Sequence, residues 1–209
     1  MPINAVIFDF GGVIVPGDGP GSFYDQLEQA HGLPPGSLFR AVYLENPRWL
    51  GLRVGDGTRE DWHRAAHELV AAISSPTVAD AVIEAFAAPR EVRFNDGMID
   101  LIDSLRGQVR VGLLSNAAPG LEDDLRDHYG IYDLFDDVIN SATVRLAKPD
   151  PAIYRLASER IGADIRTCFF TDDLLHNIEA ARAAGMTAHQ FDGSTGLIAA
   201  LRTAGVLLD

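Results

Sequence analysis

The sequence of 209 residues lacks the features that mark secreted and membrane-spanning proteins. Its single cysteine, Cys168, has no partner for an intramolecular disulfide, and its place in an apolar run predicts a buried thiol. No apolar run reaches the roughly 20 residues that a helix needs to cross a bilayer. The N-terminus leads from Met1 into the apolar residues 5–8 without the cationic region of a secretory signal. We therefore expect a cytoplasmic protein that does not contact membranes.

Basic residues are also scarce, because 17 lysines and arginines face 30 aspartates and glutamates and leave a formal net charge of −13. Proteins that bind nucleic acid usually carry a basic patch, so this charge argues against a nucleic-acid partner. The same charge repels an anionic substrate at long range unless a metal ion or a few local cations reverse the potential at the site. A site for anions in this chain is therefore expected to include a metal ion.

Strand and helix signals alternate along much of the chain. Short apolar runs of the β type occur at residues 5–8, 109–114, 138–139, 168–170 and 186–190. Segments with helical periodicity occur at residues 97–105, 119–128, 151–161, 174–184 and 196–204. This alternation predicts the α/β class, with a three-layer, Rossmann-like core in which helices cover a parallel sheet.

A long segment between the first two strands contains no convincing strand. The apolar positions from Trp62 to Ile73 follow the i, i+3, i+4, i+7 pattern of one buried helical stripe. Further helical patterns occupy residues 22–31, 35–44 and 77–87. Residues 16–92 are therefore expected to form an all-helical cap subdomain, inserted into a core of residues 1–15 and 93–209. The glycine- and proline-rich residues 16–21 and the segment 88–90 are the expected hinges.

Asp9 follows the first apolar run and stands directly before Phe10-Gly11-Gly12. It is therefore expected at the carboxyl end of the first strand, where open α/β sheets bind their ligands. A carboxylate at that position can attack phosphorus and form an aspartyl-phosphate. The backbone amides of Gly11 and Gly12 would be free to face the phosphoryl oxygens. On this motif alone, a turn-capping role for Asp9 is the alternative.

Two further segments offer groups that can bind an oxyanion. Ser115 and Asn116 end the second predicted strand, and their hydroxyl and amide can donate to an oxyanion without adding charge. Lys148 stands in an otherwise uncharged stretch just before a predicted helix and can neutralise phosphate as a point charge. Each segment also has an ordinary explanation, which is a helix cap for the first and a solvated lysine for the second.

The most informative segment is the pair Asp172-Asp173 at the end of an apolar strand, with Asn177 one helical turn further on. Like charges about 4 Å apart repel by roughly 4 kcal/mol at an effective dielectric constant of about 20. With Asp9 as a third acid, either protonation or a divalent cation must relieve the repulsion. Mg²⁺ suits this set, because it prefers carboxylate, carbonyl and phosphate oxygens. A helix cap would explain one of the two acids but not both.

The motifs occur in the order Asp9-Phe10-Gly11-Gly12-Val13, Ser115-Asn116, Lys148-Pro149 and Asp172-Asp173. In this order and spacing they resemble the motifs of the haloacid dehalogenase-like hydrolase superfamily. The helical insertion after the first motif resembles the helical-cap branch of that superfamily, and the resemblance covers essentially the whole chain. It implies that Asp9 is the phosphoryl-accepting nucleophile, that Ser115 and Asn116 bind the phosphoryl group, and that Lys148 orients the nucleophile and offsets charge.

The resemblance also implies a Mg²⁺ site. Asp9, Asp173 and the backbone carbonyl of Gly11 would bind the ion, and Asp172 would reach it through water. The cap would close over the site, exclude water and select the substrate. The implied activity is that of a Mg²⁺-dependent phosphohydrolase, a phosphatase acting on a small phosphorylated metabolite. The expected oligomeric state is a monomer or a homodimer.

One position departs from the pattern of the superfamily's phosphatases. They usually carry a second aspartate two residues after the nucleophile, which protonates the leaving group and activates the hydrolytic water, and here that residue is Gly11. A positioned acid or base contributes about 10² to 10⁴-fold in rate. Turnover is therefore expected to be slow, restricted to good leaving groups, or dependent on another residue. Asp18, in the first hinge, is the candidate replacement.

Two other functions stay open. A 2-haloacid dehalogenase also uses a nucleophilic aspartate, without the second acid and without a metal. This agrees with Gly11 but leaves Asp172 and Asp173 without a purpose. A catalytically weak binding or regulatory protein would also explain Gly11, although such a protein would not need to retain the nucleophile, the lysine and the metal acids.

Overall fold

The computed structural model describes residues 1–88 and 93–206. The chain forms two compact units, a core unit of residues 1–16 and 92–209 and a helical unit of residues 17–91. The predicted hinge at residues 16–21 spans the first boundary, whereas residues 89 and 90 of the second predicted hinge lie outside the described residues. That the helical unit serves as a cap stays a prediction.

The core unit is built on one parallel sheet of five strands in the order β3-β2-β1-β4-β5. The strands are β1 (Ala5–Phe8), β2 (Arg110–Ser115), β3 (Asp137–Asn140), β4 (Cys168–Asp172) and β5 (Thr187–Gln190). The strand order reverses at β1, which lies in the centre between β2 and β4. In such sheets the connections leave the two central strands in opposite directions, so their carboxyl ends border a crevice that can hold a ligand.

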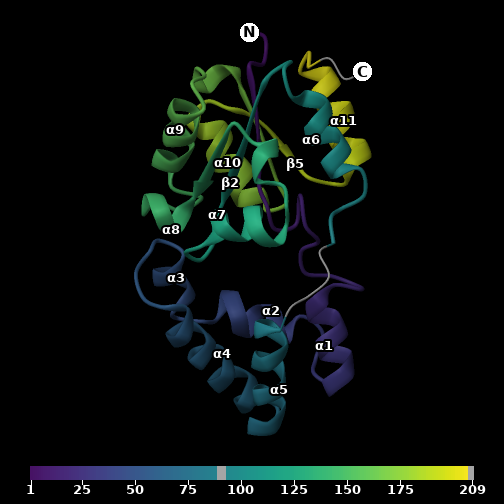
Figure 1. Ribbon diagram of the computed structural model, residues 1–209, viewed down its shortest axis with the longest axis vertical. Helices are drawn as coiled ribbons and strands as arrows, with labels where there is room; N and C mark the ends of the chain where they lie inside the picture. The colour runs from purple at the N-terminus through teal and green to yellow at the C-terminus, as the bar shows by residue number, and fades with distance from the viewer. Residues whose placement is uncertain (89–92, 207–209) are drawn as a thin grey trace. The chain divides into compact units, whose positions relative to one another are not determined.

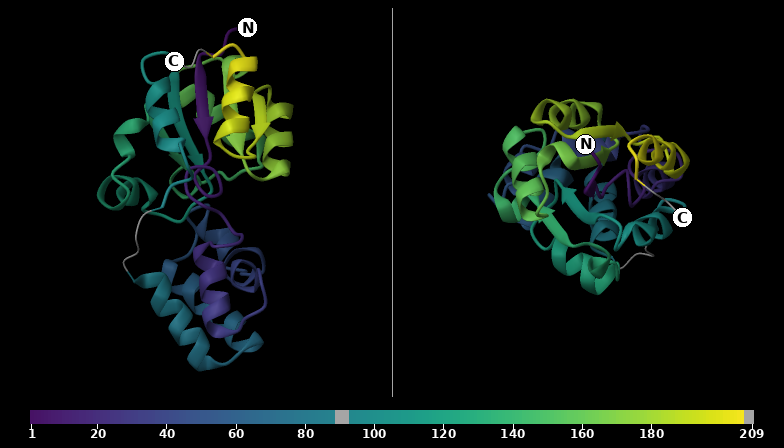
Figure 2. Two further views of the ribbon diagram at one scale, coloured as in Figure 1. Left: turned by 90° about the vertical axis from the view of Figure 1, so that its right-hand side faces the viewer. Right: turned by 90° about the horizontal axis from the view of Figure 1, so that it is seen from above.

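Side chains alternate between the two faces of the sheet and create two separate apolar layers. Val6 and Phe8 of β1 pack with α6 (Met98–Leu105) and α11 (Ser194–Thr203). Ala5 and Ile7 pack on the opposite face with α9 (Pro151–Arg160) and α10 (Leu175–Ala184). Helices therefore lie on both sides of the sheet (Figures 1 and 2), which confirms the predicted three-layer, Rossmann-like core.

The helix ends of the core unit follow from local chemistry. Pro151 begins α9, and the Asp150 side chain accepts a hydrogen bond from the Ala152 amide. Gly185 ends α10 in the left-handed region, with a φ of 110°. The helix predicted at residues 119–128 is instead a short α7 (Leu121–Asp123) continued by a π-helical turn, η2 (Asp124–His128). In the described part of the core unit, three short elements were not predicted: η3 (Tyr132–Leu134), α8 (Ser141–Val144) and η4 (Ile165–Thr167).

The helical unit contains no strand within the described residues 17–88. Its elements are α1 (Phe23–His31), α2 (Ser37–Phe39), the π-helical η1 (Arg40–Leu44), α3 (Trp49–Leu52), α4 (Arg59–Ile73) and α5 (Pro76–Ala87). Trp62, Ala66 and Val70 form the buried stripe of α4. Ile73, which was predicted to continue the stripe, is the last residue of the helix and is 49% exposed.

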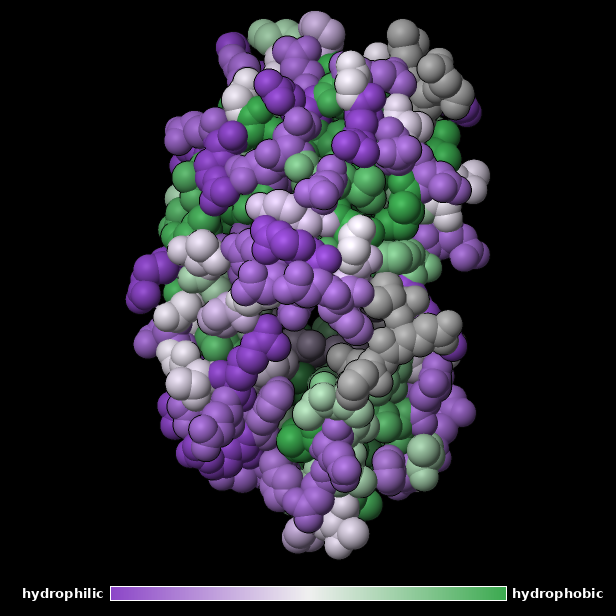
Figure 3. All heavy atoms as spheres, viewed as in Figure 1, coloured by the Kyte–Doolittle hydropathy of each residue, from purple (hydrophilic) through white to green (hydrophobic). Residues whose placement is uncertain are grey.

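The surface agrees with the charge of the chain. On the face shown in Figure 3, hydrophilic and hydrophobic side chains are interspersed and the hydrophilic ones predominate. The large exposed hydrophobic residues among those described are Met1, Leu44, Leu50, Ile73, Leu174 and Leu175. Across residues 1–88 and 93–206, no helix has both the length and the apolar character needed to cross a membrane.

A buried carboxylate organises the start of the helical unit. Glu28 of α1 is 2% exposed, and its two oxygens accept hydrogen bonds from the backbone amides of Gly36, at 2.8 Å, and Leu38, at 2.7 Å. The N-cap of α2, Gly36, has no side chain that could bond these amides. Glu28 therefore supplies from another helix the acceptors that a capping residue would normally provide.

We expect Glu28→Gln to lower the free energy of unfolding by about 1–3 kcal/mol, because the amide replaces one acceptor with a donor that faces a buried N–H. Urea unfolding followed by circular dichroism measures the change. Glu68→Gln, on the exposed side of α4, is the matched control and should leave stability nearly unchanged. Equal stabilities of the two variants would contradict the capping role.

Candidate active site

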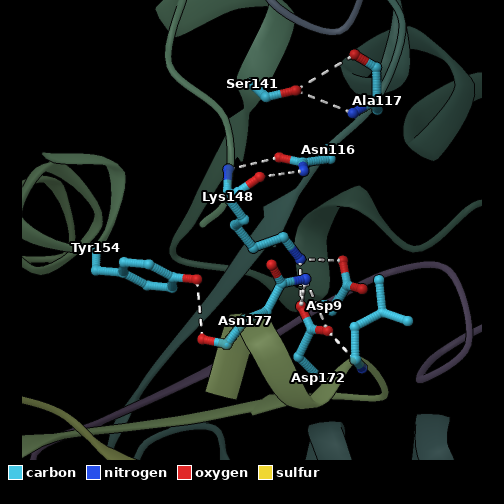
Figure 4. Close-up of polar contacts among 9 residues, drawn as sticks. Asp9, Asn116, Ala117, Ser141, Lys148, Tyr154, Asp172 and Asn177 are labelled. Atoms are coloured by element: carbon cyan, nitrogen blue, oxygen red, sulfur yellow. Dashed lines mark hydrogen bonds and ion pairs between the residues drawn. The ribbon is translucent and has the colours of Figure 1, made fainter. Parts of the chain in front are cut away.

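The centre of the site is a lysine that is bonded to two carboxylates in the interior of the core unit. The Lys148 ammonium lies 2.7 Å from Oδ1 of Asp9 and 2.6 Å from Oδ2 of Asp172 (Figure 4). The lysine side chain is 1% exposed and the Asp9 side chain 10% exposed. Asp9 directly follows β1, and its amide donates to the Thr171 carbonyl of β4, so sheet pairing continues up to the acid. The structure thus brings Asp9, Lys148 and Asp172 together where β1 and β4 end.

Asn116, directly after β2, holds the backbone of the lysine. Its side-chain amide donates to the Lys148 carbonyl at 2.9 Å, and its side-chain oxygen accepts from the Lys148 amide at 2.8 Å (Figure 4). Both polar atoms of the Asn116 side chain are thus bonded to the lysine backbone. Binding of a phosphoryl group by Asn116 stays a prediction. Ser115, the last residue of β2, is buried at 4% exposure.

Asp172 is completely buried and surrounded by hydrogen-bond donors. Besides Lys148, the side-chain amide of Asn177 lies 3.0 Å from each of its oxygens, and the Leu174 amide donates to Oδ1 at 2.9 Å. The Tyr154 hydroxyl in turn donates to the Asn177 carbonyl at 2.9 Å. The sequence indicates Asn177 only through its position one helical turn after the acids. It contains no pattern that indicates Tyr154, which is 23 residues from Asn177 in the chain.

Asp173 packs against a glycine of the first motif. Gly12 has a φ of 84°, and a Cβ on it would lie 2.5 Å from Cγ of Asp173. The close approach therefore requires glycine at position 12. Gly11 differs, because no atom of the described residues beyond its two chain neighbours lies within 4 Å of the position that its Cβ would take. A side chain at position 11 therefore has room.

The charges of the site do not balance. Burial raises the pKa of Asp9 from 3.8 to about 7, with a further rise from the charge of Asp172 and an opposing effect from Lys148. Burial and the charge of Asp172 also raise the pKa of Asp173. Burial lowers the pKa of Lys148, but its two carboxylate neighbours raise it by more, to above its usual value. One cation thus faces three acids, and for two of them, Asp9 and Asp173, burial and the charge of Asp172 disfavour the anion.

These acids form a donor set that fits a hard divalent cation. Single oxygens of Asp9, Asp172 and Asp173 all lie within 4.8 Å of one another. Three carboxylates with one lysine retain two net negative charges when all are ionised, which a divalent ion would cancel. Mg²⁺ takes oxygen ligands of this kind. Asp9 and Asp173 are the better direct ligands, because the oxygens of Asp172 already accept hydrogen bonds from Lys148, Asn177 and Leu174.

Asp18, the candidate replacement for the second acid, belongs to the helical unit. Its carboxylate lies near Gly36, 3.9 Å from the position of a Cβ there. Burial, followed by the charge of Glu28, raises the pKa of Asp18. None of these contacts involves the acids of the core unit, so its catalytic role stays a prediction.

Comparisons with known proteins agree with this arrangement. A family model described as haloacid dehalogenase-like hydrolase matches residues 3–185. Among curated proteins, a phosphatase from Mycobacterium tuberculosis (strain CDC 1551 / Oshkosh) is 28% identical over 220 residues, which cover 100% of this chain and 98% of the relative.

Solved structures of similar fold include enzymes of two kinds. A HAD family enzyme from Bacteroides thetaiotaomicron, in complex with magnesium and inorganic phosphate, matches with a TM-score of 0.67 and 21% identity, over 92% of this chain and 96% of that chain. An L-2-haloacid dehalogenase from Xanthobacter autotrophicus matches with a TM-score of 0.62 and 21% identity, over 98% of this chain and 84% of that chain. At these identities the likeness shows the fold alone.

The contact between Gly12 and Asp173 leads to a prediction. We expect Gly12→Ala to displace the Asp173 carboxylate and to weaken Mg²⁺ binding by about 10-fold or more, as measured by titration calorimetry. Gly162→Ala is the matched control, because Gly162 also has a positive φ, of 73°, but among the residues that the structure describes none beyond its chain neighbours has an atom within 4 Å of its Cβ position. Both variants carry the backbone strain and only the first carries the clash. Equal Mg²⁺ affinities would contradict the packing argument.

Proposed function

Because the chain belongs to the haloacid dehalogenase-like hydrolases, we propose that it is a Mg²⁺-dependent phosphohydrolase acting on a small phosphorylated metabolite. The observation that carries this proposal is the buried Lys148 between Asp9 and Asp172, with Asp173 completing a carboxylate set for a divalent ion. The relative named as a phosphatase, which spans the whole chain, supports a phosphate ester as the substrate.

In the proposed reaction an oxygen of Asp9 attacks the phosphorus of the substrate. The new O–P bond forms as the ester P–O bond breaks, which gives an aspartyl-phosphate, and the departing oxygen takes a proton from solvent or from Asp18 and leaves as the alcohol. Water then attacks the same phosphorus and gives a proton to solvent or to Asp18, while the bond between phosphorus and Asp9 breaks, which releases inorganic phosphate and restores the Asp9 carboxylate. Lys148 favours the ionised, nucleophilic form of Asp9, because its ammonium lies 2.7 Å from Oδ1.

The remaining groups bind the phosphoryl oxygens and offset their charge. Mg²⁺ held by Asp9, Asp173 and the Gly11 carbonyl, with Asp172 acting through water, would neutralise charge on the phosphoryl group. Ser115 and Asn116, together with the backbone amides of Gly11 and Gly12, would donate to the phosphoryl oxygens. Selection of the substrate falls to the helical unit.

The setting of the protein follows from the same proposal. The strongly acidic chain is proposed to act in the cytoplasm on a small molecule, with no nucleic-acid or membrane partner. A monomer and a homodimer both satisfy the proposal, because the site residues named above belong to one chain.

Hydrolysis of a 2-haloacid is the second candidate, and Gly11 is the residue that favours it, because no second acid is needed for carbon–halogen cleavage. The three grouped carboxylates weigh against it, since a metal-free reaction does not require them. A catalytically weak binding protein is the third candidate, and the retained Asp9 and Lys148 weigh against that role.

The first test is hydrolysis of p-nitrophenyl phosphate and a panel of metabolite phosphates, with Mg²⁺ and with chelator. We expect Mg²⁺-dependent hydrolysis, which Asp9→Asn lowers by about 10³-fold or more because the nucleophile is lost. Asp164→Asn, at an exposed aspartate paired with Arg166, is the control that should retain activity. Activity that survives Asp9→Asn would contradict the proposed nucleophile. Halide release from 2-haloacids without phosphate hydrolysis would favour the second candidate.

The open space at Gly11 allows the missing acid to be supplied. We expect Gly11→Asp to raise the rate of hydrolysis of alkyl phosphates by about 10² to 10⁴-fold, because a poor leaving group depends most on a proton donor. Gly11→Asn provides the matched side chain without an acid and should give no such increase. Steady-state rates on alkyl and aryl phosphates measure the effect. An equal increase with asparagine would contradict the role of proton transfer.

A further inference from the structure

The end of β5 donates hydrogen bonds to the backbone carbonyls of Asp172 and Asp173. In the sheet register Asp172 of β4 lies opposite Gln190, the last residue of β5. The Phe191 amide donates to the Asp172 carbonyl at 2.9 Å. The Gln190 side-chain amide donates to the Asp173 carbonyl at 3.0 Å. A strand that contributes no residue to the predicted site therefore contacts the segment that carries the acids.

The Gln190 contact acts on one peptide plane. The Asp173 carbonyl and the Leu174 amide belong to the same peptide unit, which is planar. Gln190 bonds the carbonyl of this unit, and the Asp172 carboxylate accepts from its amide at 2.9 Å. The unit is thus held at both edges, so it resists rotation about the Asp173 backbone.

Orientation of this peptide matters because the Asp173 carboxylate has little room. A Cβ on Gly12 would approach Cγ of Asp173 to 2.5 Å, so the carboxylate lies directly against the Gly12 backbone. A rotation of the peptide after Asp173 would shift its side chain against this neighbour or away from Asp9. Partners beyond the ligands commonly set ligand orientation in this way and affect metal affinity.

The geometry points to Gln190 as a positioning residue for Asp173, through which it sets the affinity of the site for Mg²⁺. This inference rests on the proposed magnesium site. Gln190 is not one of the proposed ligands of the ion, and its side-chain amide donates to a backbone carbonyl. Its effect should therefore fall on metal binding and not on the chemical step.

The test compares Gln190→Met, which keeps the length of the side chain but removes the donor, with the wild-type protein. We expect the dissociation constant for Mg²⁺, measured by titration calorimetry, to rise by about 10-fold. The hydrolysis rate should be regained at saturating Mg²⁺, and the melting temperature without Mg²⁺ should stay near that of the wild type. A structural defect would lower the melting temperature without Mg²⁺ and would not be corrected by the ion.

Gln108→Met is the matched control. Like Gln190, the Gln108 side chain is exposed and donates to a backbone carbonyl, that of Ser104, at 2.8 Å. It lies just before β2, at the amino ends of the strands and away from the site. Its variant should bind Mg²⁺ as the wild type does. Wild-type affinity in Gln190→Met, or an equal loss in Gln108→Met, would overturn the inference. A wild-type protein that binds no Mg²⁺ would overturn the magnesium site itself, and the inference with it.

Discussion

The structure of the core unit depends on one buried cation placed among carboxylates. A lysine that is 1% exposed is costly to bury unless it is paired, and Lys148 is paired twice, with Asp9 and Asp172. The surrounding bonds serve this arrangement, because Asn116 fixes the lysine backbone and Asn177 fixes one carboxylate. Loss of one partner would leave an uncompensated buried charge. Charge pairing therefore joins the segment of Lys148, before α9, to the ends of β1 and β4, and the Asn116 hydrogen bonds add the end of β2.

The parallel sheet is what brings these groups together. The carboxyl ends of neighbouring parallel strands meet at one edge, so residues far apart in sequence become neighbours without long loops. β1 and β4 run side by side up to the Asp9 amide and the Thr171 carbonyl, and the acids begin where the strands end. The edge strand β5 adds the last support, since Gln190 and Phe191 bond the carbonyls of the two adjacent acids. The register in which the strands pair therefore also determines where the site residues lie.

The sequence predicts those parts of the fold and site that follow from local pattern. All five strands and the main helices were found where apolar runs and helical periods place them, and Asp9 stands out because it directly ends such a run. The hydrogen bonds of Tyr154 to Asn177 and of Gln190 to Asp173 could not be predicted. They join residues 23 and 17 positions apart in the chain, which become neighbours only when the helices and strands pack. The four-residue helix α3 is too short to show a period. The close contact between Gly12 and Asp173 could not be predicted either, because the two residues are far apart in the chain.

The glycine at position 11 separates two requirements of phosphoryl transfer. Binding of a phosphoryl group requires that negative charge be offset, and the first motif carries one acid fewer here, because position 11 is glycine. Proton transfer requires a positioned acid, and position 11 has none. Glycine in place of aspartate at position 11 therefore favours anion binding and disfavours protonation of the leaving group. In the proposed reaction, phosphoryl transfer to Asp9 is limited by the basicity of the departing oxygen, which makes the leaving group, more than the phosphate, the feature that decides which esters are hydrolysed.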